Sequence, residues 1–298
     1  MRRAVGALVL LATLLPTPGW AQSRLVDAVA FIDYQRKPDF KIGTWVRYRV
    51  QSRSLQGYRD DYTITIVVAG EEVFWGDPGF WLETWVEGPD EPPQYTATLM
   101  SYSAFGDSMA ALKPIWFTRK TIDAVDEEGH PEETVARRMA NELKLRAANY
   151  EADRKMTANY RDTLGIDTTT VPAGHFRTLT VRQTRPVTET VDRGDSTIYY
   201  EHKEVRTFHY TDQVPLTSVA RIDIDDVQQG KSWLIGKSTD RPLNLLERAQ
   251  GALILVGYGT SGLAAQIIPK AYRHPIQRPA VRAPSRSTAP RPRAGKPG

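Results

Sequence analysis

Residues 44–50 read Thr-Trp-Val-Arg-Tyr-Arg-Val, and this alternation decides the fold. In an extended strand successive side chains point to opposite faces. Val46, Tyr48 and Val50 therefore share one face, while a tryptophan and two arginines share the other. A period of two, rich in β-branched and aromatic residues, recurs in segments 62–68, 80–87, 94–103, 175–185, 197–211 and 217–225. The pattern predicts a meandering antiparallel sheet that bends toward a barrel.

Two segments are predicted to be helical, a short one at residues 25–34 and a longer one at residues 131–156. Pro131 suits the first turn of a helix, and the two glutamates after it suit the positive helix end. The apolar residues of the longer segment recur every three or four positions on one stripe: Val135, Met139, Leu143, Ala147 and Tyr150. We therefore expect a β-rich α+β fold, a curved antiparallel sheet or half-open β-barrel covered by one or two helices.

Residues 1–21 are predicted to be a cleavable signal peptide. Arg2 and Arg3 precede an apolar run over residues 4–15, which is too short to span a bilayer permanently. Small residues, Gly19 and Ala21, place the cleavage after Ala21. The chain contains no cysteine, so we expect neither disulfides nor a lipidated N-terminal cysteine. The predicted location is periplasmic or secreted.

The net charge of +4 is distributed unevenly along the chain. Residues 269–298 hold eight lysines and arginines, seven prolines and no carboxylate. Without these eight and the two arginines of the signal peptide, residues 22–268 keep 29 of the 39 basic residues against 35 acidic ones, a net charge of −6. We expect a single domain over 22–268 and a disordered Pro/Arg-rich basic tail over 269–298. The tail either solubilises the protein or contacts an anionic membrane or the cell wall. An acidic domain argues against nucleic-acid binding.

Residues 251–268 are uncharged over 18 positions and precede the basic tail. A stop-transfer helix has the same pattern, so membrane anchoring through 251–268 is one interpretation. Four glycines and the polar residues Thr260, Ser261 and Gln266 favour another, in which two short apolar runs form a buried turn of the core.

The order of several short motifs resembles the LolA/LolB-like superfamily of exported lipoprotein-carrier folds. The motifs are Gly-Thr-Trp-Val-Arg-Tyr at 43–48, Ala-Gly-Glu-Glu at 69–72, Phe-Trp-Leu-Glu at 80–83, Val-Pro-Ala-Gly-His-Phe at 171–176, Val-Pro-Leu at 214–216 and Tyr-Gly-Thr-Ser-Gly at 258–262. The resemblance covers residues 40–265. It implies a half-open antiparallel β-barrel covered by helices that holds acyl chains in an apolar cavity. The predicted helical insertion at 131–156 departs from the compact carriers.

The sequence carries no recognisable signature of catalysis, of a metal site or of a cofactor. His202 and His209 are an odd seven residues apart on one predicted strand, which puts them on opposite faces and argues against a shared metal. The chain lacks a Gly-x-Ser-x-Gly elbow, and its one Gly-x-Gly-x-x-Gly sequence, at 257–262, lacks a βαβ setting. Asp223, Asp225 and Asp226 either attract calcium or are solvated carboxylates at a strand end.

Aromatic residues are dense between positions 45 and 85, and a concave sheet lined by them would leave a hydrophobic cleft. The residues predicted to line this cleft are Trp45, Tyr48, Trp81, Trp85, Met139 and Leu143. Glu83 and Glu87 share a strand face with Trp81 and Trp85, forming either a polar-aromatic groove or a solvated face. We expect an exported, non-enzymatic protein that binds a hydrophobic small molecule, a lipid or a lipoprotein acyl chain. The alternatives are an envelope interaction module that uses the basic tail, and an unrecognised hydrolase.

Overall fold

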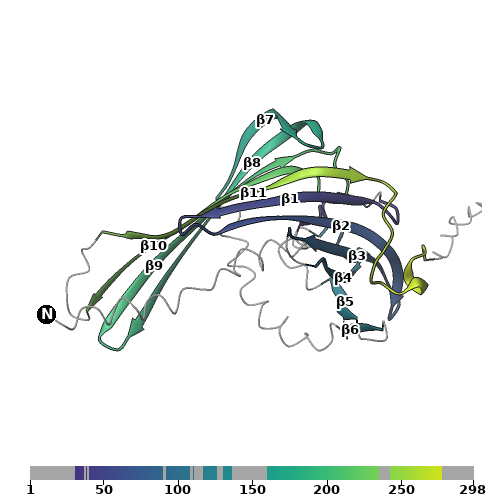
Figure 1. Ribbon diagram of the computed structural model, residues 1–298, viewed down its shortest axis with the longest axis horizontal. Helices are drawn as coiled ribbons and strands as arrows, with labels where there is room; N and C mark the ends of the chain where they lie inside the picture. The colour runs from purple at the N-terminus through teal and green to yellow at the C-terminus, as the bar shows by residue number, and fades with distance from the viewer. Residues whose placement is uncertain are drawn as a thin grey trace, which may run out of the picture.

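The computed structural model describes residues 31–36, 38, 40–89, 92–107, 110, 117–125, 130–135, 160–234 and 242–276. In these ranges eleven antiparallel strands form one open sheet in the order β6-β5-β4-β3-β2-β1-β11-β10-β9-β8-β7 (Figure 1). The strands are β1 (Trp45–Ser54), β2 (Arg59–Phe74), β3 (Asp77–Glu87), β4 (Gln94–Ser101), β5 (Thr118–Val125), β6 (Pro131–Val135), β7 (Arg161–Val171), β8 (Gly174–Arg193), β9 (Ser196–Tyr210), β10 (Val219–Leu234) and β11 (Asn244–Gly259).

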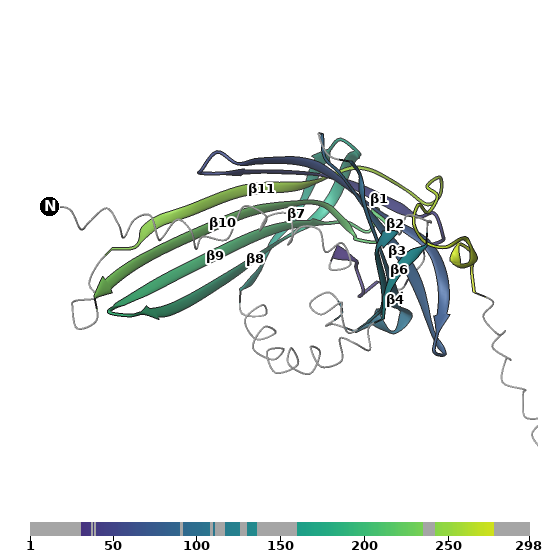
Figure 2. The same ribbon diagram turned by 60° about the horizontal axis from the view of Figure 1, so that its bottom comes forward.

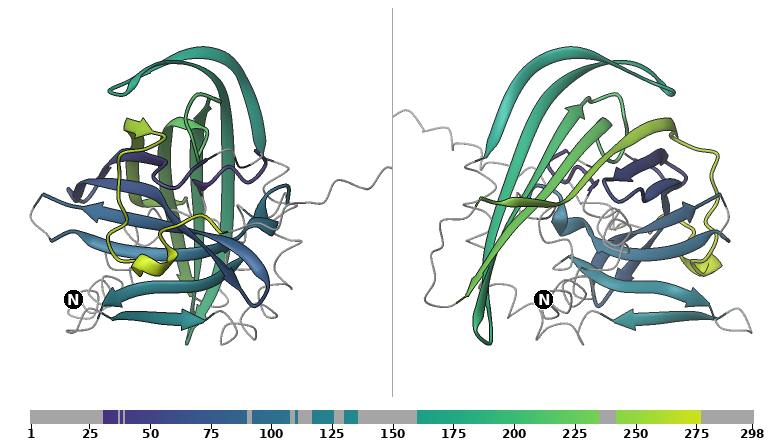
Figure 3. Two further views of the ribbon diagram at one scale, coloured as in Figure 1. Left: turned by 90° about the vertical axis from the view of Figure 1, so that its right-hand side faces the viewer. Right: turned by 60° about the vertical axis from the view of Figure 1, so that its left-hand side comes forward.

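The first and last strands pair at the centre of the sheet. β1 and β11 are antiparallel neighbours from Trp45↔Gly259 to Ser54↔Ala249. Every other pair joins strands that are consecutive in sequence, so this long-range pairing connects two meanders, β1–β6 and β7–β11. The sheet does not close, because β6 and β7 remain as its two edges. The far halves of β8 to β11 extend as a four-stranded arm (Figure 2), and the β7–β8 hairpin arches over the sheet (Figure 3).

The predicted α+β class, with one or two helices covering the sheet, is wrong. The described part of the chain is nearly all antiparallel sheet, and its only helical elements are two 3-10 turns, η2 (Tyr102–Ala104) and η5 (Lys270–Tyr272). Residues 131–135, predicted to begin a helix, form the edge strand β6, and 136–156 lie outside the described residues. Proline at the first position of an edge strand leaves no ladder hydrogen bond unmade, so Pro131 fits a strand as well as a helix start. Of the predicted helix at 25–34, the described residues are 31–34; Phe31 has 3-10 conformation, and residues 32–34 are irregular and turn structure.

The main core covers the inner face of the sheet, the face that carries Val46, Tyr48 and Val50. Its largest fully buried side chains come from six strands and one preceding segment: Tyr34, Tyr48, Ile64, Ile66, Phe80, Leu82, Met100, Ile222 and Leu255. Two non-strand segments, residues 31–40 and 211–218, pack onto this face and are joined where the Asp33 amide donates to the Leu216 carbonyl at 2.8 Å. These segments take the place of the predicted covering helices.

A second, smaller apolar cluster lies on the outer face, the opposite side of β2 to β5. It consists of Ala69, Trp81, Ala97, Leu99 and Ile122 with Ala265 and Ile268 from the end of the described chain. The last two residues belong to a segment, 260–276, that leaves β11 and crosses this face; we call it the strap. Tyr272 of the strap stacks on Trp81 at 6.0 Å between ring centroids. The described chain therefore continues past residue 268, through the first residues of the predicted tail.

Residues 251–259 belong to the central strand β11 and are not part of a helix. The predicted split at 257–262 is found, since Leu253 and Leu255 before it and Ala265 and Ile268 after it are buried, but the bend between the two runs is exposed. Leu253 and Leu255 alternate into the inner core, which is the period of a strand, and β1 and β10 pair with β11 on either side. No helix among the described residues has the length and apolarity needed to cross a membrane. The turn lies after the strand, at residues 260–262.

Candidate functional site

Four of the six residues predicted to line one cleft are described by the structure, and these four do not share one face of the sheet. Tyr48 is an inner-core residue, 1% exposed, whose hydroxyl lies 2.5 Å from Thr217 Oγ1 and donates to the Val219 carbonyl at 2.7 Å. Burial raises the pKa of Tyr48 above its ordinary value, so the phenol stays neutral. The other three described members, all tryptophans, lie on the outer face; Met139 and Leu143 lie outside the described residues. A single aromatic cleft is therefore not formed by the four described members.

Glu83 organises the tryptophan-rich part of the outer face. Its carboxylate is fully buried and accepts four hydrogen bonds, three of them from consecutive strap amides. Oε1 accepts from Ile267 N at 3.0 Å and Ile268 N at 2.8 Å, and Oε2 accepts from Gln266 N at 2.7 Å and Trp85 Nε1 at 3.1 Å. The strap covers this part of the face. The structure therefore has neither an open groove nor a solvated face at Glu83, but a contact between the strap and the sheet.

A second carboxylate extends this internal contact. Glu72 Oε2 accepts from Trp81 Nε1 at 3.1 Å, and Glu72 Oε1 accepts from Lys120 Nζ at 2.6 Å. Lys120 also pairs with Glu133 at 3.2 Å and stands over the Tyr272 ring at 5.2 Å. Burial lowers the pKa of Lys120, but the two carboxylates outweigh it and raise the pKa above the usual value. The Lys120 amine therefore stays charged within this cluster. It helps to hold the strap and is unsuited to proton transfer.

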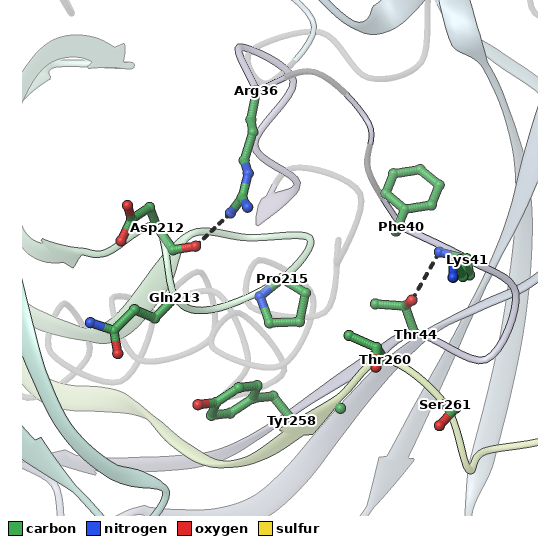
Figure 4. Close-up of a pocket in the computed structure, with 11 residues that line it drawn as sticks. Arg36, Phe40, Lys41, Thr44, Asp212, Gln213, Pro215, Tyr258, Thr260 and Ser261 are labelled. Atoms are coloured by element: carbon green, nitrogen blue, oxygen red, sulfur yellow. Dashed lines mark hydrogen bonds between the residues drawn. The ribbon is translucent and has the colours of Figure 1, made fainter.

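A cavity of about 650 Å³ lies on the inner side, where three remote segments meet (Figure 4). One wall is formed by Arg36, Phe40, Lys41 and Thr44, the second by residues 212–215, and the third by residues 258–261 at the end of β11. The second wall is joined to the first by Arg36, which donates from Nη1 to the Asp212 carbonyl at 2.8 Å. The third is fixed by Trp45, whose Nε1 donates to the Ser261 carbonyl at 3.1 Å.

The lining of this cavity combines charged and apolar groups. Arg36 and Lys41 supply two positive charges, Asp212 supplies one negative charge, and Phe40, Pro215 and Tyr258 supply apolar surface. Figure 4 shows the Phe40 and Tyr258 rings on opposite sides of the space with Pro215 between them. Among the described residues, the Lys41 amine makes no ion pair or hydrogen bond, whereas the Lys41 backbone N–H donates to Thr44 Oγ1 at 3.0 Å. Such a site can hold a molecule with an anionic group and an apolar part.

Phe40 connects the cavity to the inner core. Its ring lies 5.1 Å from that of Phe80 and 5.7 Å from that of Phe105 between centroids. Aromatic packing of this kind holds one wall rigidly while the cavity side stays open.

An Asp–His–Thr series lies elsewhere on the sheet and has the order of a nucleophilic triad. Asp223 Oδ2 lies 3.3 Å from His209 Nε2, and His209 Nδ1 lies 3.1 Å from Thr169 Oγ1. Thr169 is 8% exposed and its hydroxyl also contacts Thr178 Oγ1 at 2.8 Å. Thr169 lines neither the cavity described above nor the smaller hollow beside Asp223 and Asp225, and its burial leaves the hydroxyl poorly accessible to a substrate. The series is a buried polar network that joins three strands.

The three aspartates considered for calcium lie within β10, away from its ends, and each has a cationic or imidazole partner. Asp223 pairs with Arg221 at 2.6 Å, Asp225 with Arg248 at 3.0 Å, and Asp226 contacts His202. Burial raises the pKa of Asp223, but its bonds to His209 and Arg221 outweigh this and hold the pKa below the usual range. No group of three or more metal-ligating side chains occurs in the part of the chain that the structure describes.

Comparison with known proteins finds no matching family model and no matching curated protein. Among solved structures, the chain is similar to a predicted lipoprotein from Parabacteroides distasonis ATCC 8503, at 10% identity over 76% of this chain and 99% of that chain, with a TM-score of 0.28. It is also similar to a predicted exported protein with a YmcC-like fold from Bacteroides fragilis NCTC 9343, at 9% identity over 74% of this chain and 98% of that chain, with a TM-score of 0.28. The first of these proteins is described as a lipoprotein and the second as an exported protein. Similarity at this level carries no inference about fold or function, and the relation to LolA/LolB-like carriers stays a prediction.

Sequence analysis did not identify the residues around the cavity. Arg36, Phe40 and Lys41 lie in a segment without periodicity, and Pro215 and Tyr258 are 43 positions apart by their numbers. The walls come together through the β1–β11 pairing and through contacts such as that of Arg36 with the Asp212 carbonyl, none of which a local pattern predicts. One available signal was the clustering of glycine, threonine and serine at 257–262, which predicts a turn beside a strand end.

Proposed function

We propose that the protein is an exported, non-enzymatic binding protein and that its inner-side cavity takes an amphipathic anion, such as a fatty acid or a lipid with an anionic head. The observation that carries the proposal is the 650 Å³ cavity in which Lys41 and Arg36 stand beside Phe40, Pro215 and Tyr258. Its volume lies within the range of small-molecule sites, about 300–1,000 Å³.

The proposed contacts divide the ligand into two parts. The anionic group pairs with the Lys41 amine, and the apolar part lies between the Phe40 and Tyr258 rings (Figure 4). This differs from the cleft expected from the sequence, because Tyr48 is a core residue, Trp81 packs against the strap, and Trp85 is buried on the outer face.

A fluorescent fatty acid and its methyl ester test this division. We expect the acid to bind at one molecule per chain and the ester about tenfold more weakly, because the ester cannot make a charge-assisted hydrogen bond. Lys41→Gln should weaken binding of the acid to about the level of the ester. Thr260→Trp, which fills the cavity from its third wall, should abolish binding of both probes.

Lys203→Gln is the matched control, since Lys203 is an exposed lysine of β9 that does not line the cavity. Native mass spectrometry of the purified protein provides a second readout of stoichiometry. The proposal fails if neither probe binds, or if Thr260→Trp binds both probes like the unmodified protein.

A further inference from the structure

The turn between β2 and β3 places a tryptophan where turn chemistry favours asparagine. Trp75 and Gly76, the two residues between the paired Phe74 and Asp77, have φ angles of 52° and 80°. A two-residue hairpin turn with both φ angles positive is of type I′, for which Asn-Gly is the preferred sequence. A left-handed conformation is costly for a bulky residue, and such outliers concentrate at functional sites. The side chain of Trp75 is nevertheless 58% exposed, so burial does not offset the cost.

The exposed tryptophan is held on a fixed base. Its ring lies 4.1 Å from that of Phe74 between centroids, and Phe74 packs against the outer-face cluster. Val73, on the same hairpin, is 52% exposed. The end of the hairpin therefore presents a preformed apolar tip whose side chains are already ordered.

The strap ends beside the same hairpin, so the basic tail begins there. The Tyr272 carbonyl lies so close to Gly70 of β2 that an added Cβ would come within 2.0 Å of it. Further along, Ile276 N donates to Glu71 Oε2 at 2.8 Å. Glu71 lies on β2, four residues before Trp75 in the turn, a separation of at most about 13 Å at the rise of a strand. Figures 1 and 2 show the end of the strap and the β2–β3 turn at the same end of the molecule.

The chain that follows this anchor is strongly cationic. Residues 277–298 contain six lysines and arginines and no carboxylate, whereas residues 22–268 carry a net charge of −6. An aromatic tip beside a polycationic segment matches the two features of a bilayer surface, an interfacial zone that favours tryptophan and a layer of anionic phosphates.

We propose that the β2–β3 tip and the basic tail together dock the protein on an anionic lipid bilayer. Trp75 and Val73 enter the interfacial zone, and the cations of 277–298 contact lipid phosphates. The surface is separate from the inner-side cavity, and the proposal does not depend on the ligand proposed for that cavity. The strap makes the two contacts simultaneous, because Glu71 fixes the start of the tail next to the tip.

Sedimentation of the purified full chain with lipid vesicles tests the proposal. We expect binding to phosphatidylcholine vesicles that contain phosphatidylglycerol, and little binding to pure phosphatidylcholine. Trp75→Asn should weaken binding about tenfold through loss of the aromatic anchor, while asparagine keeps or improves the turn. Replacing Arg278, Arg282 and Arg286 by glutamine should weaken binding by more than about tenfold, since each cation near an anionic surface contributes about fivefold.

Leu234→Asn is the matched control, because Leu234 is 53% exposed and is the last residue of β10. Figure 1 shows β10 ending on the arm, at the opposite end of the molecule from the strap. It should leave vesicle binding unchanged. Added salt should weaken binding of the unmodified protein and of Trp75→Asn to a similar degree, because it screens the cations alone. The proposal is overturned if Trp75→Asn binds as the unmodified protein does, if pure phosphatidylcholine binds equally well, or if the protein sediments with purified cell-wall polymer and not with vesicles.

Discussion

Replacing Glu83 by glutamine tests whether its charge holds the strap on the outer face. The carboxylate accepts four hydrogen bonds, two at each oxygen. Glutamine keeps one oxygen and places an NH₂ group where two of the four donors point, so two bonds are lost. Hydrogen bonds to a charged acceptor contribute about 1.5–3 kcal/mol each, and removal of a buried charge returns part of its desolvation cost. We expect the free energy of unfolding to fall by about 2–4 kcal/mol.

Two measurements separate release of the strap from general loss of stability. For a domain of this size, such a change lowers Tm by about 5–15 °C. Hydrogen exchange of the amides of Gln266, Ile267 and Ile268 should accelerate at temperatures well below that transition, because these amides lose the acceptor that protects them. Amides of the central strand β1 should keep their protection under the same conditions.

Glu87→Gln is the control, since Glu87 lies on the same strand face but makes a single long hydrogen bond, 3.3 Å from Thr63 Oγ1. Its effect on the free energy of unfolding should stay within about 0.5 kcal/mol. If Glu83→Gln melts together with Glu87→Gln, and the strap amides exchange no faster than in the unmodified protein, the carboxylate does not hold the strap.

Three other changes probe the core, the acid response and the path of the strap. Tyr48→Phe should lower the free energy of unfolding in urea by about 1–3 kcal/mol, because the buried Val219 carbonyl loses its donor; an unchanged midpoint would contradict this. The pKa of Asp223 is lower in the folded state, so its ionised form stabilises the fold above the unfolded pKa, about 3.9, and this contribution is lost as the pH falls through the folded pKa. Asp223→Asn should therefore flatten the acid side of a plot of Tm against pH, and an equally steep fall would refute the assignment. Gly70→Ala should displace the strap, because the added Cβ would overlap the Tyr272 carbonyl; limited proteolysis should then cut within residues 262–276, and resistance equal to that of the unmodified protein would show that the strap has another path.

The strand faces could be predicted from the sequence because they follow from local geometry. Alternation at residues 44–50 puts Val46 and Tyr48 in the inner core, where the structure has both. Periodicity does not tell which face is covered or by what. The prediction that residues 81, 83, 85 and 87 share a face agrees with the sheet. Glu83, however, is covered by a segment about 180 positions further along the chain, which no spacing on β3 can indicate.

The helix predicted from residue 131 was wrong because the same residues suit two different structures. A proline followed by two glutamates suits a helix start, but Pro131 also suits the first position of an edge strand, and pairing of β6 with β5 decided between them. The interpretation of residues 251–268 as a membrane helix was wrong for a related reason. The composition of this stretch is equally suited to a membrane helix and to a strand with partners on both sides, and β1 and β10 supply those partners.

The strap links the two proposed surfaces through a short length of chain. Ser261, at its start, lines the inner-side cavity and accepts from Trp45, whereas Ile276, at its end, is fixed beside the β2–β3 tip. Glu83 holds the middle, so the position of the cavity wall and the exit of the basic tail depend on the same carboxylate. If the strap responds as one unit, Glu83→Gln should weaken both binding of the fatty-acid probe and binding to anionic vesicles. Loss of vesicle binding alone would show that Trp45 suffices to keep the cavity wall in place, and would confine the role of Glu83 to the tail.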